Sequence, residues 1–132
     1  MYRIFFGPRM AALAFAAAAS SCAPPPSPPS PIQLSPVTLS AKQVAIVQSD
    51  TRKRLKDPES ARFGVFAAGA DQNGQISVCG YLNAKNSFGG YIGEKPFAGT
   101  LTSEGFFLIG FGDNDNDLAA VTAFCRRRSL ML

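Results

Sequence analysis

A chain of 132 residues has room for one small domain, and its composition excludes several classes of function. It contains no histidine, so it has neither a Ser-His or Cys-His nucleophile nor a histidine metal ligand. The net charge of +4 falls to +2 once a signal carrying Arg3 and Arg9 is removed. That charge is too weak to favour nucleic-acid binding, and we expect no nucleic-acid partner.

Residues 1–21 have the layout of an export signal. Arg3 and Arg9 give a positive start, and an unbroken apolar run follows from Met10 to Ala19. This run is too short for a lasting transmembrane anchor, which takes roughly 20 residues. We therefore expect residues 1–21 to be a signal peptide and the protein to be exported.

The small residues Ser20 and Ser21 directly before Cys22 resemble the lipobox of bacterial lipoproteins, with Ala19 where leucine is usual. The resemblance implies that the Cys22 thiol is acylated and becomes the new N-terminus, held in a membrane. Ala23 follows instead of aspartate, which by the same analogy favours the outer membrane, on its periplasmic or its outer side. The alternative is an ordinary secretory signal cut near Ala19 or Ser21, which would leave Cys22 as a free thiol.

Residues 22–36 form a proline-rich tether, with seven prolines between positions 24 and 36 and serines among them. Such a segment favours extended polyproline II and buries no core. At about 3.1 Å per residue it would reach roughly 40 Å. Residues 37–132 are then the single domain.

We predict a helix from Ser40 to about Lys56, because Ser40 and Gln43 form a capping box. Asp57-Pro58 would end it, since the residue before proline avoids the helical region. A second helix is predicted from about Asp117 to Arg128, with acidic residues at its start and arginines at its end, as the helix dipole favours.

Between the two helices the sequence predicts four antiparallel strands: Arg62–Phe66, Gln75–Lys85, Tyr91–Leu101 and Phe106–Phe111. Asn73-Gly74 is the strongest hairpin signal between them. Pro96 lacks an amide donor, so its strand should lie partly at an edge or carry a bulge. The last strand is apolar on both faces, which is typical of a central strand. The expected fold class is α+β: an N-terminal helix, a four-stranded antiparallel sheet and a C-terminal helix.

Cys79 and Cys125 are predicted to form a disulfide. An exported chain normally pairs its thiols, and an acylated Cys22 would leave these two as one matched pair. Closing a loop of this size would stabilise the fold by roughly 4 kcal/mol in the chain-entropy model. The last helix should then cover the face of the sheet that carries Cys79, and the first helix should cover the other face.

The most distinctive polar and aromatic cluster lies around a glycine-rich turn, and we take it as a candidate binding surface. Its members are Asn83, Lys85, Asn86, Ser87, Phe88 and Tyr91. The two aromatic rings would stack on a ligand while the lysine and the asparagine at position 86 bond to it. The alternative is that glycines beside aromatics only mark a turn or a bulge.

A weak metal candidate lies at Asp113, Asp115 and Asp117, which place oxygen ligands at alternate positions. A calcium loop of this type also needs glycine at its sixth place and glutamate at its twelfth, where Leu118 and Phe124 stand. Helix N-capping explains the same residues. We expect neither a bound metal nor a cofactor.

Two patterns carry a further resemblance. D-P-x-S-A-x-F spans residues 57–63, and V-C-G-x-x-N-x-K-N-S-F-G-G-Y-x-G-x-x-P-F spans residues 78–97. Together they resemble small exported bacterial lipoproteins to which no activity is assigned. The resemblance implies a shared fold and no chemistry.

The sequence therefore predicts a non-catalytic, membrane-tethered envelope lipoprotein whose partner is an envelope protein or a glycan. One alternative is a secreted binding or inhibitor module without lipid. Another is a carboxylate-based hydrolase of envelope glycans that uses Glu59, Glu94 or Glu104.

Overall fold

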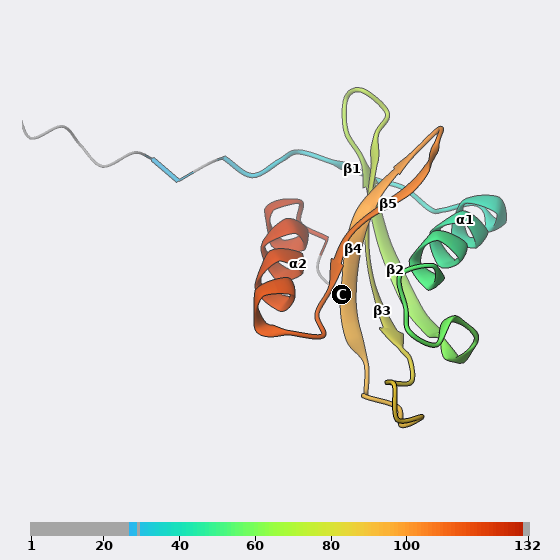
Figure 1. The fold of residues 1–132 in the computed structure, drawn as a ribbon. Helices are drawn as coiled ribbons and strands as arrows, with labels where there is room; N and C mark the ends of the chain where they lie inside the picture. The colour runs from blue at the N-terminus through green and yellow to red at the C-terminus, as the bar shows by residue number, and fades with distance from the viewer. Residues whose placement is uncertain (1–26, 29, 131–132) are drawn as a thin grey trace, which may run out of the picture.

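The computed structural model describes residues 27–28 and 30–130, and in this part the chain forms an α+β domain (Figure 1). A five-stranded antiparallel sheet has the order β1-β2-β3-β4-β5, so each strand pairs with its neighbour in sequence. The elements follow the chain as β1 (Ser35–Pro36), α1 (Ala41–Arg52), the 3-10 helix η1 (Pro58–Ser60), β2 (Arg62–Ala70), β3 (Ile76–Asn83), β4 (Lys95–Thr102), β5 (Gly105–Phe111) and α2 (Asp115–Arg127).

The sheet has five strands, not the expected four, because the end of the proline-rich segment pairs with it. Ser35 and Pro36 lie opposite Ala70 and Gly69, and the Val37 amide donates to the carbonyl of Ala68 at 3.0 Å. A proline has no amide to give to a ladder, so it is tolerated at this outer edge. The first element of the described chain is therefore a strand, and α1 follows it.

Helix α1 begins as predicted at the capping box of Ser40 and Gln43. It ends at Arg52, four residues before the expected end. The amides of Arg54 and Leu55 donate to carbonyls three positions back, at 3.0 Å each. This tighter pattern is typical of a helix end, so the chain leaves the helix before it reaches Pro58.

The strands differ from the prediction in length and in position. β2 continues to Ala70, and β4 begins only at Lys95. β5 pairs with β4 alone, so the expectation that it is a central strand is wrong. Only one face of this apolar strand is well buried at its start: Phe106 faces the core, whereas Phe107 on the opposite side is 54% exposed. Pro96 lies in an interior strand, and the nearest irregularity is the register shift at 98/99 between β4 and β5.

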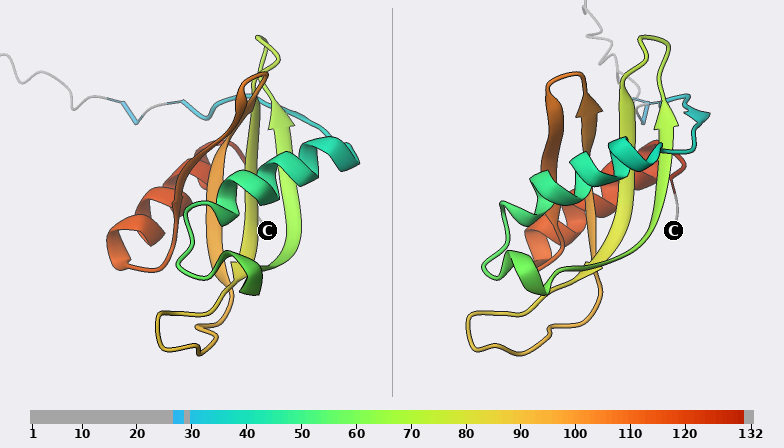
Figure 2. Two further views of the ribbon diagram at one scale, coloured as in Figure 1. Left: turned by 45° about the vertical axis from the view of Figure 1, so that its right-hand side comes forward. Right: turned by 90° about the vertical axis from the view of Figure 1, so that its right-hand side faces the viewer.

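The two helices cover opposite faces of the sheet, as predicted (Figures 1 and 2). Val47 of α1 packs with Val78, Leu82 and Phe97 in the larger core. Gly80 also lies on this face. A Cβ at this position would come within 2.6 Å of the Phe97 ring, which explains why the residue is a glycine. The close approach lets aromatic rings fill the space between helix and sheet at edge-to-face angles.

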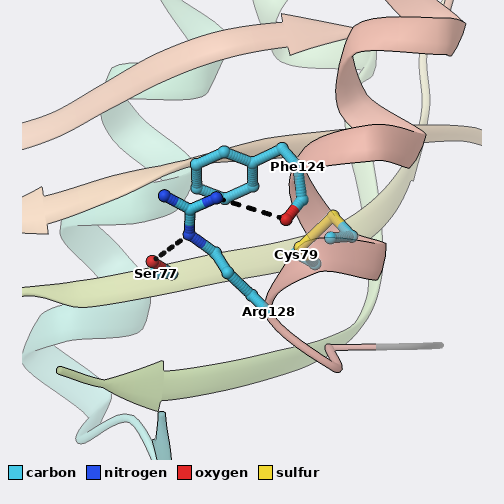
Figure 3. Close-up of a disulfide and its surroundings, with 5 residues drawn as sticks. Ser77, Cys79, Phe124 and Arg128 are labelled. Atoms are coloured by element: carbon cyan, nitrogen blue, oxygen red, sulfur yellow. Dashed lines mark hydrogen bonds between the residues drawn. A yellow bond between two sulfur atoms is a disulfide. The ribbon is translucent and has the colours of Figure 1, made fainter. Parts of the chain in front are cut away.

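The predicted disulfide between Cys79 and Cys125 is confirmed and lies in the smaller core under α2 (Figure 3). It joins the fully buried centre of β3 to the last turns of α2, with the two Cα atoms 6.1 Å apart. Val121 and Leu130 are buried beside it. This core is small, so a covalent link adds much to what apolar burial supplies.

Arg128 closes the C-terminal end of α2 onto β3 (Figure 3). Its Nε donates to the hydroxyl of Ser77 at 3.0 Å, and its guanidinium carbon lies 3.6 Å from the centroid of the Phe124 ring. Burial first, and then the charge of Arg127, lower the pKa of this guanidinium. The group has no carboxylate partner within salt-bridge distance among the described residues. It donates instead to the neutral oxygens of Ser77 and Phe124.

Candidate functional site

The candidate binding surface forms the long loop 84–94 between β3 and β4, at one end of the sheet (Figure 2). The proline-rich segment joins the sheet at the other end, where Ser35 lies opposite Ala70 next to the turn of residues 71–75. The eight residues of β3 separate the two ends, about 25 Å at the usual rise of a strand. The loop therefore lies at the end of the sheet opposite to the one where β1 pairs with β2.

Asn86 stabilises the tip of this loop through hydrogen bonds within the loop. Its side-chain oxygen accepts the amides of Phe88 at 3.0 Å and Gly90 at 3.1 Å. Its own amide donates to the carbonyl of Gly90, and its carbonyl accepts the amide of Gly89. Gly89 has a φ of +81°, in the left-handed region that favours glycine. The Asn86 side chain thus shapes the loop through its oxygen, which accepts two amides of the same loop.

Ser60 ties the loop to the short helix η1. Its hydroxyl oxygen accepts the Lys85 amide at 2.9 Å, and its carbonyl accepts the Tyr91 hydroxyl at 3.3 Å. The same hydroxyl donates to the carbonyl of Asp57 at 2.8 Å. Lys85 and Tyr91 also face each other in an isolated antiparallel bridge. Hydrogen bonds to Ser60 therefore hold the loop at Lys85 and at Tyr91, on both sides of its tip.

Tyr91 is flanked by two cations. The guanidinium carbon of Arg62 lies 4.5 Å from its ring centroid, and the Lys85 ammonium lies 5.5 Å from it. These distances are within the range of cation–π attraction. Tyr91 is still 39% exposed, but the two cations already cover part of its ring, so the whole ring is not available for stacking on a ligand.

Phe88 is the one large apolar side chain at the tip, and it is 96% exposed. Ser87 beside it is exposed as well. Burying such a ring normally contributes about 1.5–3 kcal/mol, and this one contributes almost none of that to the fold. Phe88 is therefore the member of the cluster that is free to contact a partner.

The structure brings five of the six predicted residues together in loop 84–94 and leaves one out. Asn83 is the last residue of β3, opposite Arg62. Its side-chain oxygen is buried and accepts no hydrogen bond from the residues that the structure describes. Asn83 is half-buried and belongs to the strand, not to the loop.

A cavity of about 210 Å³ lies beside the loop, and most of its lining was not predicted from the sequence. Lys56, Lys95 and Phe111 come from three different segments and meet only because the strand ends converge there. A lysine after a helix or at the start of a strand is usually a solvated end, so the sequence carried no signal for this grouping.

The three candidate catalytic glutamates do not come together in any of four cavities of the described chain. Only Glu104 lines one of them, together with Asp50. Lys53 and the amide of Phe106 hydrogen-bond to the Asp50 carboxylate and lower its pKa below the ordinary value of 3.8. A general acid of a glycosidase needs the opposite shift.

The weak metal candidate resolves into a helix cap. The side chain of Asn114 accepts the amide of Asp117 at 3.0 Å, and α2 begins at Asp115. Asp113 and Asp115 are exposed. Over residues 27–28 and 30–130 no group of three or more potential ligands could hold a metal ion.

Cys22 lies outside the described residues, so the predicted lipid site has no structural counterpart here. Within the described part of the chain, neither helix is long and apolar enough to cross a bilayer. Comparison of the chain with models of protein families, with curated proteins and with solved structures found no match.

Proposed function

We propose that this protein is a non-catalytic envelope lipoprotein that presents a binding loop at the membrane-distal end of a tethered domain. The observation that carries the proposal is the state of Phe88, which is 96% exposed at the tip of a loop fixed by internal hydrogen bonds. Binding residues are often found on such loops, held by a rigid scaffold. Aromatic side chains are also among the most frequent anchors of protein interfaces.

The position of the tether supports the same proposal. A lipid on Cys22 would place the membrane at the far end of residues 22–34, before β1 begins. The Ile32 amide donates to the Arg127 carbonyl and Leu34 packs against the smaller core, so residues 22–31 are left as the spacer. These residues could reach about 30 Å as polyproline II, and the sheet adds about 25 Å beyond them. Loop 84–94 would then face away from the anchoring membrane, toward an envelope protein or glycan.

The outer membrane is the proposed anchoring membrane, on the strength of the lipobox resemblance and of Ala23 after the cysteine. We propose no catalytic role. None of the four cavities brings together two of Glu59, Glu94 and Glu104, the carboxylates that a glycan hydrolase of this composition would use.

Mass spectrometry of the mature N-terminus tests the anchoring half of the proposal. The wild-type protein should begin with a diacylglyceryl-modified Cys22 and sediment with membranes. The variant Cys22→Ser should lose both properties while its domain remains folded. A free Cys22 thiol, or cleavage beyond this residue, would favour the secreted binding or inhibitor module instead.

A further inference from the structure

The cavity beside loop 84–94 combines an apolar wall with an excess of positive charge. It lies on the α1 side of the sheet, where the chain after α1 meets the ends of β3 and β5. The apolar part of its lining consists of Leu55, Leu82, Ala84, Ile92 and Phe111. Leu82 and Ala84 are almost fully buried and form a fixed floor, while Ile92 is 39% exposed.

Three lysines, Lys56, Lys85 and Lys95, line the same cavity against one acid, Asp113. None of these four residues forms a salt bridge within the part of the chain that the structure describes, where the single ion pair is Lys53–Asp50. Lys85 already lies near the ring of Tyr91. The ammonium groups of Lys56 and Lys95 have neither an ion-pair partner nor an aromatic ring recorded against them in the described chain.

Unpaired like charges around an apolar floor repel one another, and an anion placed among them removes that repulsion. The apolar floor adds affinity for a hydrocarbon group, at about 0.8 kcal/mol for each methylene buried. A volume of about 210 Å³ is below the usual range for drug-sized ligands, so only a short group fits.

We propose that this cavity binds the anionic end of an amphiphilic ligand, a carboxylate or phosphate group attached to a short apolar chain. The apolar chain would lie against Leu82 and Phe111, and the anion would lie between Lys56 and Lys95. This inference rests on the proposed binding role of this end of the domain and names the chemistry of a ligand there. Phe88 does not line the cavity, so the two ideas can fail separately.

The test titrates small probes into the full chain in non-ionic detergent and follows the amide resonances of Ala84, Ile92 and Phe111 by NMR. Hexanoate and hexyl phosphate represent the two sources of the anion. Acetate and inorganic phosphate lack the apolar chain, and hexanol lacks the charge. At least one of the two six-carbon anions should shift these resonances saturably, about tenfold more tightly than its chainless partner and than hexanol. The anion that binds more tightly identifies the headgroup.

Matched variants assign the charge to the cavity. Lys56→Gln/Lys95→Gln should weaken binding about tenfold, whereas Lys56→Arg/Lys95→Arg should keep it. Lys42→Gln removes an exposed lysine of α1 that does not line this cavity, and it should change nothing. Phe88→Ala should also leave probe binding intact. Absence of saturable shifts at millimolar probe, equal binding of hexanol, or equal binding of the chainless anions would overturn the inference.

Discussion

The hydroxyl oxygen of Ser60 accepts the backbone amide of Lys85 at 2.9 Å, across 25 positions of the chain. This contact joins the segment 57–63 to the segment 78–97, the two stretches that stand out in the sequence. Asp57 caps the amide of Ser60, and Ala61 after it is 7% exposed. The fold thus accounts for these residues, but it gives no packing role to Phe88.

The disulfide should supply a large part of the stability of the domain. Replacing Cys79 or Cys125 by serine is expected to lower the free energy of unfolding by about 2–4 kcal/mol, because a link across 46 positions no longer restricts the unfolded chain. Urea unfolding followed by circular dichroism measures the change. The double variant is the control, since a reducing agent should lower the midpoint of the wild type and leave that of the double variant unchanged. A wild-type midpoint that does not respond to reduction would contradict the prediction.

Asp50 should stabilise the domain in a pH-dependent way. Its carboxylate accepts the amide of Phe106 at 2.9 Å and the ammonium of Lys53, and removing it leaves that amide without its partner. Asp50→Ala is expected to cost about 1–2 kcal/mol of unfolding free energy at neutral pH. Lys53→Ala should cost less than about 1 kcal/mol, because that ammonium is exposed.

The sign of the pH effect follows from the direction of the pKa shift. The folded protein holds the pKa of Asp50 below 3.8, so the stabilisation is complete above that value and is lost as the pH falls through the lower, folded pKa. The difference between wild type and Asp50→Ala should therefore shrink below about pH 4. A difference that stays constant from neutral pH to pH 2 would show that the charge of Asp50 contributes nothing.

Asn86 should be needed for the shape of the loop tip. Asn86→Ala removes the acceptor of the Phe88 and Gly90 amides and is expected to lower stability by about 0.5–1.5 kcal/mol. Hydrogen exchange at these two amides should become faster. Ser87→Ala is the matched control and should change neither quantity, because Ser87 is exposed. Unchanged exchange in Asn86→Ala would mean that the loop keeps its shape without this side chain.

Local patterns predicted the features that depend on neighbouring residues. The capping box of Ser40 and Gln43 and the turn at Asn73-Gly74 are both present. The disulfide and the opposite placement of the two helices followed from cysteine counting and from alternation along β3. These inferences needed only spacing and chain chemistry.

The errors concern pairing, which spacing alone does not determine. An apolar run such as 106–111 occurs in central strands, but β5 is an edge strand with Phe107 exposed. The pairing of Ser35-Pro36 with β2 has no local signal, since proline usually marks the absence of a strand. The hydrogen bonds from the Phe88 and Gly90 amides to Asn86 were not predicted either, because they depend on the fold of the whole loop.

Position-specific photocrosslinking in living cells can show whether Phe88 contacts a partner. A photoreactive phenylalanine analogue at position 88 is compared with the same analogue at Phe107, which is exposed on β5 near the end of the sheet where β1 pairs. We expect a discrete adduct from position 88 and none from position 107. Excess wild-type chain should suppress that adduct, and excess Phe88→Ala chain should not. Equal adducts from both positions, or no adduct from position 88 in a folded and exported protein, would contradict the binding role of loop 84–94.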